Sequence, residues 1–265
     1  MARDTMSVKT STDLGTMMAS RSQPTVKFGT HLTPATRAVL ADHAYQSVRA
    51  LIMDHVLGPG AHVSVDGLAR ELNVSQTPLR EALAWLEAEG LLKKEALRGY
   101  FVSPLLSKHE LDDLFEFRLR LEPWACARAA ERVTAKGRLQ LQRESKSLAV
   151  IPGGTNNERY KLLFAHDQRL HQLLFAIAGN TVVAQAYNRA HCHLHLYRLS
   201  QRTAVSTQTT DEHRRIVSAV IEGNPHEAYG AMEAHLGRSL RRLATGLETS
   251  KVLDSEAING ASIEV

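Results

Sequence analysis

The feature that most constrains the fold is an apolar repeat of three and four residues that continues after Pro104 with few interruptions. Glycine-containing breaks interrupt it at Gly153-Gly154, Gly179-Asn180 and Gly223-Asn224-Pro225. Helices are therefore expected at 107–132, 135–149, 157–178, 181–201, 208–222 and 225–246. Because such helices can bury their apolar faces only against one another, the sequence predicts an all-helical bundle over 105–247.

The first part of the chain follows a different plan. Its expected elements are three helices and a β-hairpin, at 36–56, 65–72, 77–89 and 91–102. Gly58-Pro59-Gly60 stops the first helix, and Arg98-Gly99 provides the hairpin turn. This order predicts a winged helix-turn-helix over 36–104, so the fold class is mainly α with a small β-hairpin wing. The aperiodic segments 1–35 and 248–265 are expected to be a flexible N-terminal arm and a flexible tail.

Composition narrows the class of protein. A chain of 265 residues with 43% hydrophobic and 23% charged residues is long enough for two folded domains. Its two cysteines, Cys126 and Cys192, form neither a disulfide framework nor a zinc-finger spacing. The N-terminus lacks a signal-peptide layout, and no apolar run approaches the ~18 residues that span a bilayer. We therefore expect a cytoplasmic protein with no membrane partner, whose net charge of +4 permits nucleic-acid binding without requiring it.

Residues 68–83 indicate two helices joined by a tight turn at Asn73. Thr77 is expected to cap the second helix, with Pro78 at its first position, where a missing N–H is harmless. The exposed N-terminal end of such a helix suits DNA, because its free N–H groups attract phosphate and its side chains reach base edges.

Side chains with DNA-binding chemistry gather at this end. Arg80 is expected to read guanine and Gln76 adenine, whereas Ser75 and Thr77 are expected to hold phosphates. The remaining expected DNA contacts lie on the preceding helix and the wing: Arg70, Lys93, Lys94, Arg98 and Gly99. Taken singly, these features also fit an ordinary capped helix pair with a solvated basic turn, but together and in this order they favour DNA binding.

The stretch resembles the winged helix of GntR-type bacterial regulators. It contains the pattern Leu-Ala-x-x-Leu-x-Val-Ser-x-Thr-Pro-x-Arg-Glu-Ala-Leu from Leu68, then Glu-Gly-Leu, and the match runs through Arg98-Gly99 to Val102. Gln76 stands where many members have arginine, so the base preference at that contact is not carried over. The resemblance implies a sequence-specific transcription regulator.

Four residues of the types that bind metals lie on inward-facing stripes of three predicted helices: Asp167, His171, His213 and His235. Burying one carboxylate and three imidazoles without partners would cost several kcal/mol. A divalent ion removes that cost, and the donor set suits Zn²⁺ as well as Ni²⁺, Mn²⁺ or Fe²⁺. Each histidine alone could instead be a satisfied core or interface residue.

The same segments resemble the FCD effector domain of the FadR subfamily. The matching residues are Asp167-x-x-Leu170-His171 with Ala178-Gly179-Asn180, then Glu212-His213-Arg214-x-Ile216, then Ala234-His235-Leu236. The resemblance implies that the Asp and the three His bind a divalent metal, which with nearby residues holds a small carboxylate effector.

Two further residues are assigned to the effector, Arg118 and His193. Arg118 lies on an inward stripe, and the resemblance implies that it points into the effector cavity, where a guanidinium suits a carboxylate. A salt bridge between Arg118 and Glu122 is an equal alternative. Among His191, His193 and His195, one or two are expected to line the cavity wall.

These observations predict a homodimeric regulator that binds a near-palindromic double-stranded operator. A small organic acid bound at the metal and Arg118 would change the operator affinity of the dimer. A metalloenzyme that uses the Asp/His site is one alternative, but no catalytic motif or separate general base accompanies the site, so the chain is not expected to be an enzyme. A metal that is purely structural, or that is itself the signal, is the other alternative.

Overall fold

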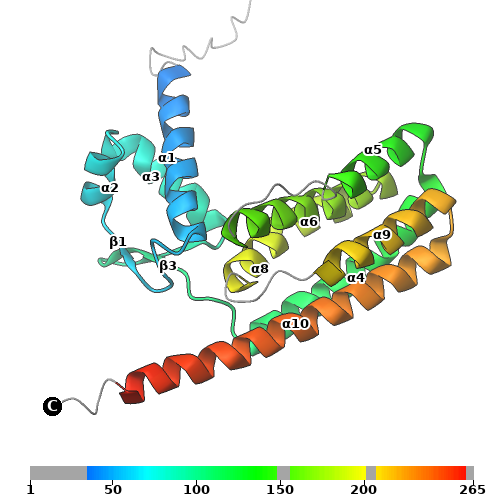
Figure 1. Cartoon of the computed structure of the whole chain (residues 1–265). Helices are drawn as coiled ribbons and strands as arrows, with labels where there is room; N and C mark the ends of the chain where they lie inside the picture. Colours follow the sequence, from blue (N-terminus) through cyan, green and yellow to red (C-terminus); the bar gives the residue numbers. More distant parts are fainter. Residues whose placement is uncertain (1–34, 148–155, 201–206, 261–265) are drawn as a thin grey trace, which may run out of the picture.

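The computed structural model describes residues 35–147, 156–200 and 207–260, and side-chain surroundings at 38–147, 160–199 and 208–247. In these residues a winged helix-turn-helix precedes a bundle of helices, as predicted (Figure 1). The expected N-terminal arm, 1–35, lies outside the described residues except for Ala35. No helix in the described ranges is long and apolar enough to cross a membrane.

The N-terminal domain combines three helices with a small sheet. Its elements are α1 (Ala35–Met53), β1 (His62–Val63), α2 (Val65–Glu71), α3 (Gln76–Ala88), β2 (Leu92–Glu95) and β3 (Gly99–Val102). α1 packs against α3, and buried side chains such as Val48 and Leu83 share one core with the sheet. The antiparallel strands follow the order β1-β3-β2, with Leu92 opposite Val102. The sequence does not predict β1, because two residues are too few to show an alternating pattern.

The predicted cap of α3 at Thr77 is wrong. The helix begins at Gln76 with Ser75 as its N-cap residue, and the Ser75 side chain makes no capping hydrogen bond. Pro78 therefore occupies the third helical position instead of the first. Its missing N–H still removes no bond within the helix, because the first N–H groups of a helix have no partner inside it.

The C-terminal domain is the predicted helical bundle. Its elements are α4 (Lys108–Arg132), α5 (Ala135–Lys146), α6 (Asn156–Ala178), α7 (Thr181–Arg189), α8 (Cys192–Ser200), α9 (Thr207–Glu222) and α10 (Pro225–Gly260). α4 packs against both α10 and α6, and α9 packs against α10. A capping box fixes the start of α4, because Ser107 and Glu110 satisfy each other's backbone N–H groups.

Two predicted elements differ from the structure. The single helix predicted over 181–201 is broken into α7 and α8 at His191, whose backbone is left-handed with a φ of 45°. A left-handed residue other than glycine costs roughly 1–2 kcal/mol, and no glycine or proline marks this break in the sequence. The tail expected from 248 is helical as far as Gly260, where α10 ends. That segment lacks an apolar stripe, but it contains no glycine or proline before Gly260 that would stop a helix.

The two domains share a buried contact centred on α8. Leu194 and Tyr197 belong to the apolar cluster of the winged helix. Arg198 Nη2 donates to the backbone oxygen of Ser103 over 2.5 Å, and His55 Nε2 lies 3.1 Å from the Arg198 oxygen. Figure 1 shows α8 at the end of the bundle nearest the winged helix. A movement of α8 would therefore directly displace residues of the DNA-binding domain that contact it.

His195 on α8 makes this contact sensitive to pH. Its ring lies so close to Gly90 that a Cβ added there would come within 3.2 Å of the ring carbon Cε1. Burial lowers the pKa of His195, as do the nearby Arg198 and His191, while Glu110 opposes the shift. The folded state therefore favours neutral His195.

We expect the metal-free protein to lose stability as the pH falls from about 7.5 to about 5.5. A histidine whose pKa is lowered by folding contributes stability that is complete above its ordinary pKa of ~6.5 and is lost as the pH falls toward the folded pKa. The urea midpoint of the wild type, measured in a chelator, should therefore fall further than that of His195→Gln. The exposed His226 supplies the control, since His226→Gln should follow the wild type. Equal pH dependence of the wild type and His195→Gln would contradict this expectation.

Candidate metal centre and nucleic-acid interface

The structure brings together the four residues predicted as metal ligands. Asp167 and His171 come from α6, His213 from α9 and His235 from α10, and one ligand atom from each lies within 4.8 Å of the others. Asp167 Oδ1 lies 3.1 Å from His213 Nε2 and 3.7 Å from His171 Nε2. Ligands bound at ~2.1 Å in a tetrahedral site lie ~3.4 Å apart, so these two distances already suit one ion, and the most widely separated ligand atoms have to approach each other by up to ~1.4 Å.

His171 is oriented by Glu122, which accepts from its Nδ1. Glu122 also accepts from Arg118 Nε at 2.5 Å and from the Tyr187 hydroxyl at 2.9 Å. Burial alone would raise the pKa of the Glu122 carboxyl, but Arg118 and His171 outweigh burial and hold that pKa well below its usual range. Because the Nδ1 proton of His171 is committed to Glu122, Nε2 presents a lone pair to the cluster. This buried nitrogen has no hydrogen-bond partner among the described residues.

His235 is oriented in the same way by Glu212. The carboxylate accepts from His235 Nδ1 at 2.8 Å and is itself held by Arg238 at 2.7 Å and Arg242 at 2.9 Å. Burial lowers the pKa of His235 to about 3, although the hydrogen bond to Glu212 opposes the shift. A neutral imidazole that donates through Nδ1 carries its lone pair on Nε2.

His213 has a histidine as its outer partner. His166 Nε2 lies 3.0 Å from His213 Nδ1, and His166 Nδ1 lies 2.9 Å from Glu144 Oε1. Since the carboxylate can only accept, His166 Nδ1 carries the proton and His166 Nε2 accepts from His213 Nδ1. Burial and then His213 lower the pKa of His166, which keeps it neutral. His213 Nε2 therefore also presents a lone pair. Asp167 Oδ1, 3.1 Å away, is an acceptor as well and cannot donate to it, so this nitrogen too has no hydrogen-bond partner among the described residues.

Asp167 completes the cluster with its second oxygen anchored. Oδ2 lies 2.8 Å from His193 Nδ1, which leaves Oδ1 facing the ligand nitrogens. Burial would raise the pKa of Asp167, but His171 and His193 outweigh it and hold the pKa below its usual range. The carboxyl group is therefore ionised and oriented.

The donor set fits a divalent cation. Three imidazole lone pairs and one carboxylate oxygen face one another in a buried space, where acceptors without a donor or cation are strongly unfavourable. The alternative of satisfied core histidines accounts for the three Nδ1 atoms but leaves Nε2 of His171 and His213 without partners. Nitrogen and carboxylate oxygen are ligands that Zn²⁺ and related ions accept.

The two residues predicted to hold an effector lie beside this cluster. For Arg118, the salt bridge to Glu122 is confirmed, and two of the five guanidinium N–H groups serve it. His193 bridges Asp167 and the Tyr187 hydroxyl, 3.0 Å from its Nε2. Contact of either residue with an effector stays a prediction.

Sequence reasoning missed three residues around the ligands: Glu144, His166 and Tyr187. His166 precedes Asp167 in the chain, but neighbouring residues on a helix face different directions, so spacing does not connect it to the site. A tyrosine on an apolar helix face is typical of a core residue, so Tyr187 gives no signal. Glu144 approaches from α5 through tertiary packing.

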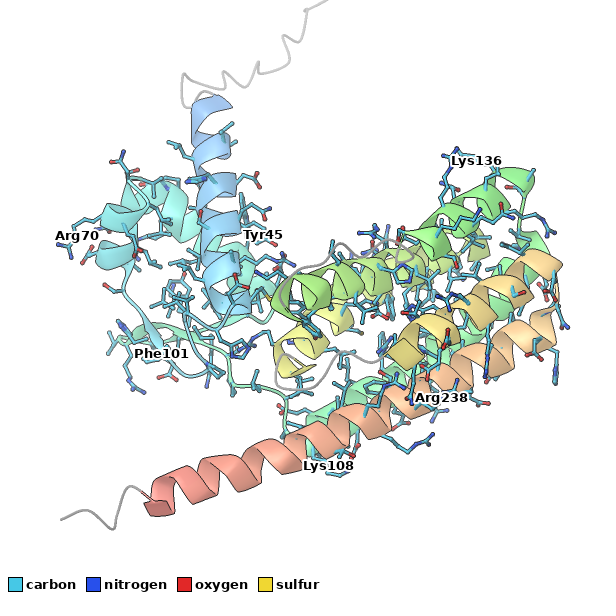
Figure 2. The ribbon with its side chains drawn as sticks, viewed as in Figure 1. Tyr45, Arg70, Phe101, Lys108, Lys136 and Arg238 are labelled. Carbon is cyan, nitrogen blue, oxygen red and sulfur yellow. The ribbon has the colours of Figure 1, made fainter. Side chains whose placement is uncertain are left out.

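The predicted DNA-contacting side chains are exposed on one domain. Ser75, Gln76, Thr77 and Arg80 are exposed at the N-terminal end of α3. Lys93, Lys94 and Arg98 are exposed on β2 and the hairpin turn, where Gly99 has a φ of 91° that favours glycine. Figure 2 shows Arg70 on the side of the winged helix that faces away from the bundle.

The two predicted base-reading residues are linked to each other. Arg80 Nη2 donates to Gln76 Oε1 at 3.3 Å, and Gln76 Nε2 donates to Asp66 Oδ1 at 2.6 Å. Gln76 and Asp66 belong to the lining of an open hollow of about 520 Å³, which is formed by Asp66, Ala69, Arg70, Asn73, Val74, Ser75 and Gln76. Asp66, which the sequence does not single out, therefore orients the amide group that stands where many GntR-type proteins have arginine.

An exposed recognition helix joined to a helical domain with a buried Asp/His cluster defines a two-domain DNA-binding regulator. The family model "Bacterial regulatory proteins, gntR family" matches residues 40–102, and the FCD domain model matches 113–238. An Escherichia coli protein named for the regulation of an L-lactate dehydrogenase operon is 30% identical over 74% of this chain and 83% of its own length. The HTH-type transcriptional regulator YdhC of Bacillus subtilis is 26% identical over 78% of this chain and 92% of its own length.

The fold agrees with that of solved regulators. Escherichia coli McbR/YncC superimposes with a TM-score of 0.61 at 17% identity, covering 78% of this chain and 97% of its own. The chain belongs to the GntR family of bacterial regulatory proteins and carries an FCD effector domain behind its winged helix. It is a sequence-specific transcription regulator and not an enzyme, as predicted.

We expect Arg80→Ala to weaken binding to a duplex operator by ~1–3 kcal/mol, or about 5–150-fold, and to relax the base preference, because a bidentate arginine–guanine contact is lost. Lys93→Ala should weaken binding to all duplexes alike, because a phosphate contact carries no sequence information. Fluorescence anisotropy with an operator selected from random DNA measures both effects. Arg120→Ala is the control, since Arg120 is exposed on α4 in the other domain. If Arg80→Ala distinguishes the operator from random DNA as well as the wild type does, Arg80 does not read a base.

Proposed function

We propose that this regulator binds a near-palindromic operator as a homodimer and that a small carboxylate effector, bound at a divalent metal in the FCD domain, controls its operator affinity. The observation that carries the proposal is the convergence of the buried Nε2 atoms of His171 and His213, which lack hydrogen-bond partners among the described residues, on Asp167 Oδ1. His235 supplies the fourth ligand. Zn²⁺ is our first choice of metal, with Ni²⁺, Mn²⁺ and Fe²⁺ as the other candidates.

Charge favours an anionic effector. One aspartate and three neutral histidines leave a divalent ion with a net charge of about +1, which a monocarboxylate would neutralise. Arg118 lies beside the cluster, and donors beyond its pair with Glu122 could take a carboxylate oxygen. The relative named for an L-lactate dehydrogenase operon points to the same class of compound, since lactate is a small carboxylate.

α8 offers a route from the metal centre to DNA. At its start His193 contacts Asp167, and farther along the helix Leu194, Tyr197 and Arg198 contact the winged helix. An effector that shifts α8 would change the orientation of α3, and in a dimer the spacing of the two recognition helices must match the operator half-sites. Such a regulator would act in the cytoplasm, where bacterial DNA lies.

Metal analysis tests the site itself. We expect purified wild-type protein to hold about one divalent ion per chain, and we expect Asp167→Ala and His213→Ala to lose it, because each removes one of four ligands. His226→Ala, at an exposed histidine outside the cluster, should keep the ion. Wild-type protein that takes up no metal after purification in its presence would remove the metal from the proposal.

Carboxylate titrations test the regulatory role. We expect small hydroxycarboxylates such as L-lactate to stabilise the metal-loaded protein by ~2.7 kcal/mol at 100 times Kd, which a higher melting temperature would report. They should also change operator affinity in anisotropy assays. Both responses should vanish in Asp167→Ala. If metal-free protein responds to the acid just as well, the metal is structural. If metal alone changes operator binding, the metal is itself the signal.

A further inference from the structure

The three histidine ligands have unequal outer partners. His171 and His235 each donate Nδ1–H to a carboxylate, that of Glu122 and Glu212 respectively. His213 instead donates to the neutral imidazole of His166. A carboxylate acceptor makes the opposite ring nitrogen a stronger metal ligand, and a neutral acceptor does so less.

His166 is fixed by a partner on a different helix. Its side chain is 1% exposed and packs between His213 on α9 and Glu144 on α5. Arg169 donates from Nε and Nη2 to Glu144 at 2.9–3.2 Å, and the Arg169 side chain is half exposed. The hydrogen-bond chain Arg169–Glu144–His166–His213 therefore runs from the surface to the centre of the bundle.

The direction of the protons in this chain is determined. Arg169 can only donate and an ionised Glu144 can only accept, so the proton between Glu144 and His166 sits on the histidine. His166 then has one acceptor atom left, and it faces His213 Nδ1. Any change that removes this acceptor leaves a buried N–H of His213 without a partner and frees the ring to turn.

We propose that His166 and Glu144 are positioning residues that set the strength of the bond between His213 and the metal, and that His213 is the weakest of the three histidine ligands. This inference rests on the metal site proposed above. Through Glu144, α5 would then influence the affinity for the ion although it supplies no ligand. The metal centre would thus be adjustable from the protein surface through a ligand on α9.

The test uses the full-length protein and Zn²⁺, with dissociation constants measured by competition against a chromophoric chelator. We expect His166→Phe, which cannot accept from His213, to raise Kd by about 10–100-fold. His166→Gln, whose amide oxygen can accept, should stay within a few-fold of the wild type. Glu144→Gln should fall between the two. Glu131→Gln, at an exposed carboxylate paired with Arg128, is the matched control and should bind as the wild type does.

A spectroscopic readout separates positioning from folding. In Co²⁺-loaded protein the visible absorption bands report ligand geometry, so His166→Phe should alter them and His166→Gln should restore them. Alanine substitution should also rank the ligands, with His213→Ala losing less Zn²⁺ affinity than His171→Ala or His235→Ala. Circular dichroism of the metal-free variants identifies any that fail to fold. If His166→Phe does not fold, the Zn²⁺ dissociation constant and the Co²⁺ spectrum of Glu144→Gln, compared with those of Glu131→Gln, test the positioning role instead.

The outcomes distinguish the two proposals. If the wild type binds no Zn²⁺, the metal site is wrong and the positioning role falls with it. If the wild type binds Zn²⁺ but His166→Phe and Glu144→Gln match it in Kd and in the Co²⁺ spectrum, the positioning role alone is overturned. Equal losses from alanine at all three histidines would overturn the ranking.

Discussion

Hydrogen-bond acceptors buried at the centre of the helical bundle impose the constraint on which the rest of that domain depends. Three buried imidazoles meet beside the partly buried Asp167, so each ring has to be held by its outer nitrogen. Glu122, Glu212 and His166 provide these contacts from α4, α9 and α6. The bundle is therefore organised around a polar centre as much as around its apolar core.

The outer partners are in turn neutralised. Arg118 pairs with Glu122, two arginines of α10 hold Glu212, and Arg169 covers Glu144. Of these pairs, Arg118–Glu122 is fully buried, and removing one of its members would leave an uncompensated buried charge, which is strongly destabilising. The pair with Glu122 explains how an arginine can be buried on an inward stripe of α4.

Much of this could be predicted from helical periodicity. Asp167 and His171 are four residues apart, and the stripes around His213 and His235 point inward, so the convergence of these four residues could be predicted from the sequence. The exposed end of α3 was predictable from the turn at Asn73 and the apolar anchors behind it. The N-cap position of α3 at Ser75 was not predictable, because a cap depends on backbone angles that neighbouring serine and threonine residues adopt about equally well.

By itself the sequence determined the two-domain order, the helical class of the second domain and the four residues that converge, because these depend on local periodicity and on which face of a helix is apolar. Only the tertiary structure decided the partners of those residues and the break at His191, which local preference opposes. It also placed α8 against the winged helix. Contacts between residues far apart in the chain depend on how helices pack, and no spacing rule within one helix encodes that packing.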